Sequence, residues 1–237
     1  MNIQTDSRRA QNMRKRRARI LAGARKLLTQ GGFEAVNLRA IARLAAITVP
    51  TIYNLVGNKE ELLAALFAEV LNEIESRITS AQTTEPLALA EAVVLASTAL
   101  FPDDEDYYRS AFLAVEYLNQ SGEHRATVAQ FYNWGEQLLT AGFLACKEAR
   151  LLRERIAPTV LGELIMRTFR TNCRAWAFGQ ITIEEFRARA LTDVYITLAA
   201  DAVETFHARL LKMLTEHGAV PRSPRTQPCR RPKEHSR

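Results

Sequence analysis

The sequence predicts an all-α fold, and three observations lead to that prediction. Apolar residues make up 47% of the 237 residues, whereas glycine and proline number only ten and eight. Apolar side chains recur at the spacing of amphipathic helices through most of the chain. Four of the prolines fall in the last seventeen residues, so the rest of the chain contains few helix breakers.

A first helix is predicted over about residues 10–30, after a start that we expect to be unstructured. Its apolar residues, among them Ile20 and Leu28, repeat on one face and are expected to point inward. Gly31 and Gly32 follow, and glycine is common just beyond the C-terminus of a helix. The helix is therefore expected to end there.

Two short helices joined by a tight turn are predicted next, over residues 38–45 and 49–55. Asn37 is a good N-cap for the first of them. Thr48 is a good N-cap for the second, and Pro50 sits in its first turn, where a missing N–H costs little. This layout is typical of a helix-turn-helix, whose second helix lies in the major groove of DNA.

The remaining elements are predicted to be longer helices that form one body. A helix that begins near Lys59 carries an apolar stripe long enough to connect a DNA-binding head to this body. Further helices are expected over residues 86–101, 103–121, 124–156, 158–179 and 183–217. Residues 218–237 are rich in Pro and Arg and are expected to be disordered. The predicted domains are therefore residues 1–58, residues 59–217 and this tail.

Charge is divided unevenly along the chain. The formal net charge is +6, but residues 1–56 carry +9, residues 57–217 carry −8 and the last twenty residues carry +5. A basic head on an acidic body is the electrostatic footprint of a separate nucleic-acid-binding domain. The basic run at residues 14–19 either contacts the DNA backbone or minor groove or is a solvated helix face. The basic tail either adds non-specific DNA affinity or has no role.

Composition disfavours several other classes of function. No apolar run reaches the ~18 residues that cross a membrane, so no membrane partner is expected. The three cysteines have neither disulfide nor metal-ligand spacing, which favours a reducing, cytoplasmic location. The four histidines do not cluster, and no Gly-rich phosphate loop occurs. We therefore expect no cofactor, no metal and no enzymatic activity.

A set of short motifs around the predicted helix-turn-helix is specific in its spacing and covers about a quarter of the chain. These motifs are Gly32-Phe33, Asn37, Ile41-Ala42, Ala45-Ala46-Ile47-Thr48, Thr51-Ile52-Tyr53 and Lys59-Glu60-Glu61-Leu62. The chain here resembles the tetracycline-repressor (TetR) family of bacterial transcriptional regulators. Ala46 replaces the usual Gly of that family, and Leu55 replaces the usual His or Tyr. The resemblance implies about nine helices, the first three forming the head.

The resemblance also implies which residues contact double-stranded DNA. They are Arg39, Thr48, Val49, Pro50, Thr51, Tyr53, Asn54, Leu55 and Lys59. Asn54 is suited to bidentate bonding of adenine, and Arg39 either reads guanine, contacts a phosphate or is solvated. Tyr53 either bonds a phosphate or packs at the helix crossing. Lys59 lies at a helix N-terminus that favours an anion, which suggests a phosphate contact.

For the body, the resemblance implies a homodimer with an effector pocket. The pocket candidates are Phe112, Phe131, Trp134 and Phe169, although aromatic residues at helical spacing are usually plain core. The last two helices are expected to pair with their copies through Val194, Tyr195, Leu198, Ala202 and Phe206. The expected function is a repressor that binds a palindromic operator and responds to an apolar or amphipathic small molecule. The alternative is a DNA-binding interaction protein whose body binds another protein and no small molecule.

Overall fold

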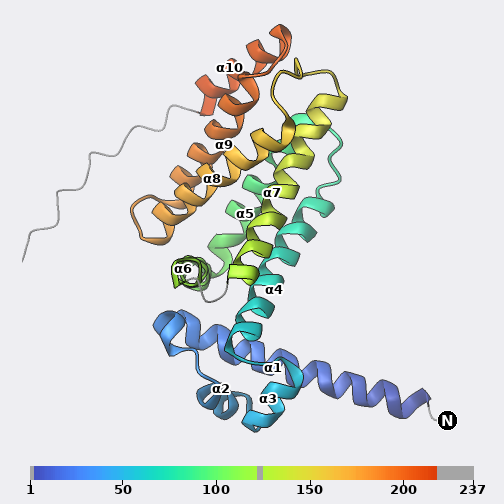
Figure 1. Cartoon of the computed structure of the whole chain (residues 1–237), viewed down its shortest axis with the longest axis vertical. Helices are drawn as coiled ribbons and strands as arrows, with labels where there is room; N and C mark the ends of the chain where they lie inside the picture. The colour runs from blue at the N-terminus through green and yellow to red at the C-terminus, as the bar shows by residue number, and fades with distance from the viewer. Residues whose placement is uncertain (1–2, 122–124, 218–237) are drawn as a thin grey trace, which may run out of the picture.

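The computed structural model of the protein describes residues 3–121 and 125–217. Within these residues the chain forms ten α-helices and one 3-10 helix, and the only β-type pairing is an isolated bridge between Leu152 and Ala202. The predicted all-α fold is therefore confirmed. Three N-terminal helices form a head at one end of the molecule, and the later helices form the body (Figure 1). The predicted tail lies outside the described residues.

The head consists of α1 (Ile3–Ala35), α2 (Leu38–Ala45) and α3 (Val49–Leu55). The helix α1 begins at residue 3, so the expectation of an unstructured start is wrong for residues 3–9. Gly31 and Gly32 have non-helical backbone angles, and the regular part of α1 ends there, as the sequence indicated. Ile20, Ile41 and Ile52 contribute one fully buried side chain from each helix to a shared core.

The cap and the turn of the helix-turn-helix lie where the sequence predicted them. Asn37 Oδ1 accepts a hydrogen bond from Ala40 N at 2.8 Å and so caps α2. Ala46 follows α2 in the left-handed conformation, with φ 49° and ψ 53°. Its N–H donates to the Arg43 carbonyl at 3.2 Å, and Ile47 N donates to the Ala42 carbonyl at 3.0 Å. These bonds reverse the chain direction in one tight turn before α3.

Replacing Ala46 with glycine is expected to raise the free energy of unfolding by about 0.5–1 kcal/mol. The left-handed conformation is unfavourable for a residue with a Cβ, and Ala46 is exposed, so no packing is lost by the substitution. Glycine adopts this conformation freely, although its larger loss of backbone entropy on folding offsets part of the gain. Urea unfolding of the full chain measures the change, and a loss of stability would contradict the strain argument.

The helix α4 (Lys59–Ser80) runs from the head into the body without a break (Figure 1). A capping box fixes its start. Asn58 Oδ1 accepts from Glu61 N at 2.9 Å, and Glu61 Oε2 accepts from Asn58 N at 2.8 Å. Leu62, Leu63 and Leu66 are fully buried. The helix α4 is therefore a continuous connection between the head and the body.

The body contains α5 (Pro86–Leu100), η1 (Phe101–Asp104), α6 (Glu105–Ser121), α7 (Arg125–Glu148), α8 (Pro158–Ala177), α9 (Ile183–Ala199) and α10 (Glu204–His217). The helix α5 packs against α4, α7 and α9, and α8 packs against α6, α7 and α9. Gly142 allows α7 to approach α5 closely, because an added Cβ would lie 2.5 Å from Ala90 Cα. The two helices therefore touch through their backbones.

The stretch Pro86–Gln120 is long and apolar enough to cross a membrane by length and composition, with a mean hydropathy of 1.3. In the fold this stretch is not one straight helix, because the chain passes through η1 between α5 and α6. Apolar residues of α5, such as Val94 and Leu100, are buried in the protein core. Its apolar character is thus explained by packing within the body.

The single helix predicted over residues 183–217 is wrong, because α9 ends at Ala199 and α10 begins at Glu204. The break is held by backbone bonds to a distant segment. Arg153 N donates to the Asp201 carbonyl at 2.7 Å, and Val203 N donates to the Leu151 carbonyl at 2.9 Å. The same segment explains why α7 ends at Glu148 rather than near residue 156. Backbone groups that would continue both helices bond to each other instead.

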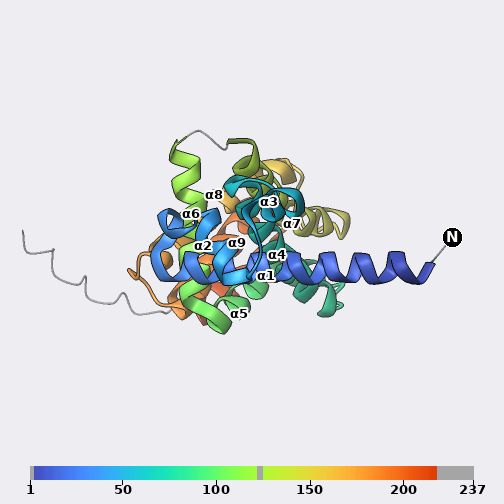
Figure 2. The same ribbon diagram turned by 90° about the horizontal axis from the view of Figure 1, so that it is seen from below.

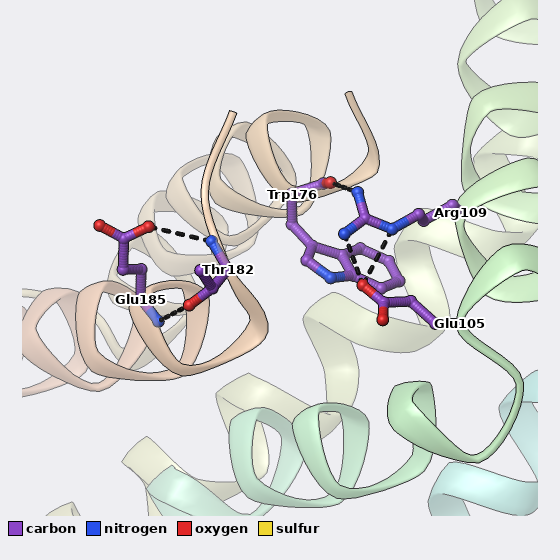
Figure 3. A network of polar contacts seen from close by, with 5 residues as sticks. All are labelled: Glu105, Arg109, Trp176, Thr182 and Glu185. Atoms are coloured by element: carbon purple, nitrogen blue, oxygen red, sulfur yellow. Dashed lines mark hydrogen bonds and ion pairs between the residues drawn. The ribbon is translucent and has the colours of Figure 1, made fainter. Parts of the chain in front are cut away.

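An arginine of α6 ties this helix to the C-terminal end of α8 (Figure 3). Arg109 Nε donates to Glu105 Oε1 at 3.0 Å, and another guanidinium nitrogen donates to the Trp176 carbonyl. The guanidinium also lies 4.7 Å from the centre of the Trp176 ring, which is fully buried. Thr182 and Glu185 form a capping box at the start of α9 in the same region. The position of α6 is thus coupled to that of α8.

Candidate functional site

The outer face of α2 and α3 carries polar and basic side chains that are free to contact another molecule. Arg39 and Arg43 are exposed on α2, and Pro50, Tyr53 and Asn54 are exposed on α3. The Tyr53 side chain is not core, because 55% of the residue is exposed. Together with Thr48, which is also exposed, five of the predicted DNA-contacting residues are therefore exposed in this part of the head, as is Arg43.

The other predicted residues of α3 are less accessible. Val49 and Leu55 are half-buried and pack against the hydrophobic core. Thr48 is at the N-cap position, but its side chain makes no cap bond to the helix backbone. Its hydroxyl instead lies 2.8 Å from the Thr51 hydroxyl. The two hydroxyls are thus hydrogen-bonded to each other at the start of α3.

Two arginines of the basic run in α1 have an internal role that the sequence did not indicate. Arg17 Nη1 donates to the Leu55 carbonyl at 3.3 Å, at the end of α3. Arg19 donates to the Ala45 and Ala46 carbonyls, at the end of α2. Helix C-termini carry unsatisfied carbonyls and a partial negative charge, so cations are favourable there. Arg17 and Arg19 therefore fasten both helices of the helix-turn-helix to α1.

Lys59, the predicted phosphate contact at the start of α4, packs on an aromatic ring. Its Nζ lies 3.8 Å from the centre of the Phe33 ring, and partial burial lowers the pKa of the ammonium group. Phe33 in turn contacts Tyr117 of α6, with ring centres 4.7 Å apart. The ring of Phe33 therefore lies against both the start of α4 and the body.

A second contact joins the head to the body through α1. Arg25 Nη2 lies 2.7 Å from Asp104 Oδ2 of η1, and its guanidinium lies 3.9 Å from the centre of the Tyr107 ring. Both charged side chains are about two-fifths exposed, so solvent weakens the ion pair to at most about 1 kcal/mol. Burial raises the pKa of Tyr107 well above its usual value, so its hydroxyl stays protonated. This contact orients α1 against η1 and α6.

The body encloses an apolar cavity of about 70 Å³ among α4, α5, α6, α7 and α8. Three of the four predicted pocket residues line it, namely Phe112, Trp134 and Phe169. The side chain of Phe131 lies outside the described residues. Four cavity-lining residues come from α4: Phe67, Val70, Leu71 and Ile74. Pockets for small molecules usually measure about 300–1,000 Å³, so a ligand must push these helices apart to enter.

Two of the cavity-lining residues, Tyr132 and Arg170, belong to a polar cluster with Glu116. Glu116 Oε1 accepts hydrogen bonds from Tyr132 Oη at 2.5 Å and from Arg170 Nη2 at 2.8 Å. The guanidinium of Arg170 also lies 4.0 Å from the centre of the Tyr132 ring. Burial, together with the hydrogen bond to Glu116, raises the pKa of Tyr132 above its ordinary value. Arg170 and Tyr132 line the cavity, and Glu116 precedes Tyr117, which contacts the head.

The described cysteines are poor nucleophiles. Burial raises the pKa of Cys146 to about 12, and it raises the pKa of the fully buried Cys173 well above its ordinary value. Both thiols therefore stay protonated at neutral pH, and the thiolate is the reactive form. In the part of the chain that the structure describes, no group of three His, Cys, Asp or Glu residues is placed to hold a metal ion.

The predicted dimer-interface residues lie inside the body. Val194, Tyr195, Leu198, Ala202 and Phe206 are all at most 3% exposed. They form part of the chain's own core, so they cannot contact a second copy in this fold, and that prediction is wrong. On α8 and α9, the exposed large apolar side chains are Val160 and Leu164 of α8 and Ile196 of α9. A hydrogen bond of 2.9 Å from Asn172 Nδ2 to Asp193 Oδ2 fixes the two helices side by side.

Comparisons with known proteins agree with this geometry. The sequence model of the family "Bacterial regulatory proteins, tetR family" matches residues 20–66, which include α2, α3 and the start of α4. The repressor KstR of Rhodococcus jostii is 33% identical over 81 residues, which make up 34% of this chain and 38% of KstR. The chain thus matches well under two thirds of that relative's length.

Two solved structures show how far the fold is shared. SmeT, the repressor of the Stenotrophomonas maltophilia efflux pump SmeDEF, superposes with a TM-score of 0.61 and 20% identity, covering 80% of this chain and 92% of SmeT. FadR of Bacillus subtilis, solved with stearoyl-CoA, gives a TM-score of 0.63 and 17% identity, covering 76% of this chain and 97% of FadR. At these identities the likeness is one of fold. Residues 20–66 thus match the tetR family of bacterial regulatory proteins, and the fold of the chain resembles that of these two structures.

Proposed function

We propose that the protein is a transcriptional repressor that binds operator DNA through the outer face of α2 and α3. The observation that carries the proposal is the exposed set of Arg39, Arg43, Tyr53 and Asn54 on a helix-turn-helix. Residues 1–56 also carry a net charge of +9, which suits a polyanionic partner. Residues 1–58 would act as the DNA-binding domain and residues 59–217 as the regulatory body, in the cytoplasm.

In this proposal each side chain has a definite task on the DNA. Asn54 and Arg39 read base edges, because amide and guanidinium groups pair bidentately with adenine and guanine. Thr51 and Tyr53 bond phosphates, and Pro50 contacts a thymine methyl group. Val49 and Leu55 add apolar contact only through their exposed parts. Thr48 positions the Thr51 hydroxyl.

Replacing Lys59 with alanine is expected to weaken binding to operator and unrelated DNA by the same factor. A lysine that neutralises one phosphate contributes about 0.9 to the slope of log K against log salt concentration, whatever the sequence. Fluorescence anisotropy with labelled duplexes over a range of salt concentrations measures both effects. Glu60→Ala, an exposed neighbour of opposite charge, is the control. A Lys59→Ala protein with an unchanged slope would remove the phosphate assignment.

Regulators of this family bind DNA as dimers and respond to small molecules. For this chain we propose a homodimer through the α8–α9 face that includes Val160, Leu164 and Ile196. These residues are exposed, whereas the neighbouring apolar residues of both helices are buried. A single recognition helix contacts too few base pairs for useful specificity, so two protomers on a near-palindrome are needed.

We also propose that an apolar or amphipathic small molecule enters the cavity and lowers operator affinity. The cavity is too small for such a molecule as it stands, so binding must displace helices. Two of the helices that line the cavity, α4 and α6, also contact the head. The helix α4 runs directly into it, and α6 contacts it through Tyr117 on Phe33 and through Arg25 near Tyr107. The ligand shifts the equilibrium only by its differential affinity for the two arrangements, typically about 1–3 kcal/mol.

A further inference from the structure

The N-terminal half of α1 extends away from the rest of the molecule. In Figure 1 it leaves the head at the level of α3, and the view from below shows it running well past the body (Figure 2). Every residue from 8 to 19 is exposed. This segment holds seven of the eleven Lys and Arg residues of the head. It is therefore a long basic helix with no protein surface beneath it.

Two arginines anchor the base of this segment to the head. Arg17 and Arg19 donate hydrogen bonds to carbonyls at the C-termini of α3 and α2, so these two guanidinium groups are partly occupied within the protein. The remaining five basic side chains point into solvent: Arg8, Arg9, Arg14, Lys15 and Arg16. Among the side chains that the structure describes, which begin at residue 8, no acidic group forms an ion pair with any of these five. The segment that we name the α1 extension, residues 8–16, thus ends next to Arg17, which bonds the C-terminus of α3.

Such a helix is poorly stabilised on its own. Arg14, Lys15 and Arg16 lie three or four residues from Arg17 or Arg19, so like charges repel each other there, and the α1 extension has no apolar face to bury. Met13, its one large apolar residue, is 51% exposed. The phosphates of a polyanion would neutralise these basic side chains and so remove the repulsion between them. DNA carries a phosphate charge about every 1.7 Å along its axis.

We propose that the α1 extension is a second DNA-binding element, which lies along the sugar–phosphate backbone beside the half-site read by α3. This inference rests on the proposed function, because the DNA-bound head brings the extension to the duplex. Its nine residues span about 14 Å at 1.5 Å per residue. That length corresponds to about four base pairs. The footprint of each protomer on the DNA should therefore be longer by about four base pairs. Arginine and lysine side chains on phosphates add affinity without sequence preference.

The test compares two full-length variants with equal loss of charge. In the first, Arg8, Arg9, Arg14 and Arg16 are all replaced by Gln, which is also a good helix former. In the control, Arg150, Arg153, Arg155 and Lys212 are replaced by Gln; all four are exposed. They belong to the segment between α7 and α8 and to α10, which lie at the end of the body away from the head (Figure 1). Binding to the selected operator and to an unrelated duplex is measured against salt concentration, and hydroxyl-radical footprints are recorded.

The expected result is a slope of log K against log salt that becomes shallower by about 3.6 for each bound protomer, because four phosphate contacts are lost at about 0.9 each. Affinities for both duplexes fall by the same factor, and protection disappears only at the flanks of the operator. The control keeps the wild-type slope and footprint. An extension variant with the wild-type slope would overturn the inference. The slope would also stay unchanged if the extension bound RNA or an acidic protein instead of the operator DNA. A wild-type protein that selects no operator would instead contradict the proposed function.

Discussion

Replacing both Leu164 and Ile196 with aspartate is expected to split the dimer and to abolish operator binding. These side chains are 39% and 55% exposed in the protomer, so charges there leave its core intact. In a dimer buried through this face, four unpaired carboxylates would lose their hydration, which is costly. Operator affinity should fall by at least about 1,000-fold, toward the level of non-specific binding.

Light scattering and operator titration measure the two effects together. Leu211→Asp is the matched control, because Leu211 is an exposed apolar residue of α10 outside the proposed face. It should leave both the mass and the affinity unchanged. A wild-type protein that is monomeric at micromolar concentration would contradict the dimer proposal. Charges at Leu198 or Ala202 would be a poor test, since both residues are buried and the protein would unfold.

Replacing Ala111 with leucine is expected to leave DNA binding intact and to abolish the response to the ligand. Ala111 lines the cavity of about 70 Å³, and a larger side chain fills space that a ligand would otherwise take. Compounds that raise the melting temperature of the wild-type protein should fail to do so for the variant. Operator affinity, which ligand lowers by about 5–150-fold in the wild type, should become independent of ligand.

A thermal-shift screen with hydrophobic drugs, acyl compounds and aromatic metabolites supplies the ligands for this test. Ala141→Leu is the control, because Ala141 is an exposed residue of α7 outside the cavity lining. Circular dichroism checks that both variants fold. If compounds stabilise Ala111→Leu as strongly as the wild type, the cavity is not the binding site. If they stabilise the wild type without changing operator affinity, the coupling proposal fails.

The head could be predicted closely from the sequence because local signals define it. Asn37 and Asn58 cap helices through bonds to residues two or three positions away, and Gly31 and Gly32 interrupt α1 through their own backbone angles. Such contacts lie within a few residues, so a single sequence contains them. The same reasoning failed at residues 200–203, where hydrogen bonds to residues 151–155, two between backbone groups and one to the Asp201 carboxylate, break a helix that its own pattern favours.

The candidate sites could be predicted only in part, for a related reason. An apolar stripe indicates that a face is covered but not by what, so Val194 and Leu198 suggested a partner subunit when the chain's own body covers them. Arg17 and Arg19 suggested DNA or solvent because their carbonyl partners lie 38 and 26 residues away. The aromatic residues of the cavity were easier to predict, because large apolar side chains in the middle of a helical body pack together in its centre however the helices are arranged.

A binding selection from random double-stranded DNA tests the central claim most directly, using the full-length wild type, Asn54→Ala and Arg39→Ala. The wild type should enrich a near-palindrome, with half-sites centred about 34–36 Å apart or at a larger spacing that keeps both major grooves on one side. Each variant should lose preference at particular symmetric positions by about 1–3 kcal/mol, while the rest of the motif stays the same. No enriched motif for the wild type, or the same motif for all three proteins, would contradict recognition through the outer face of α2 and α3.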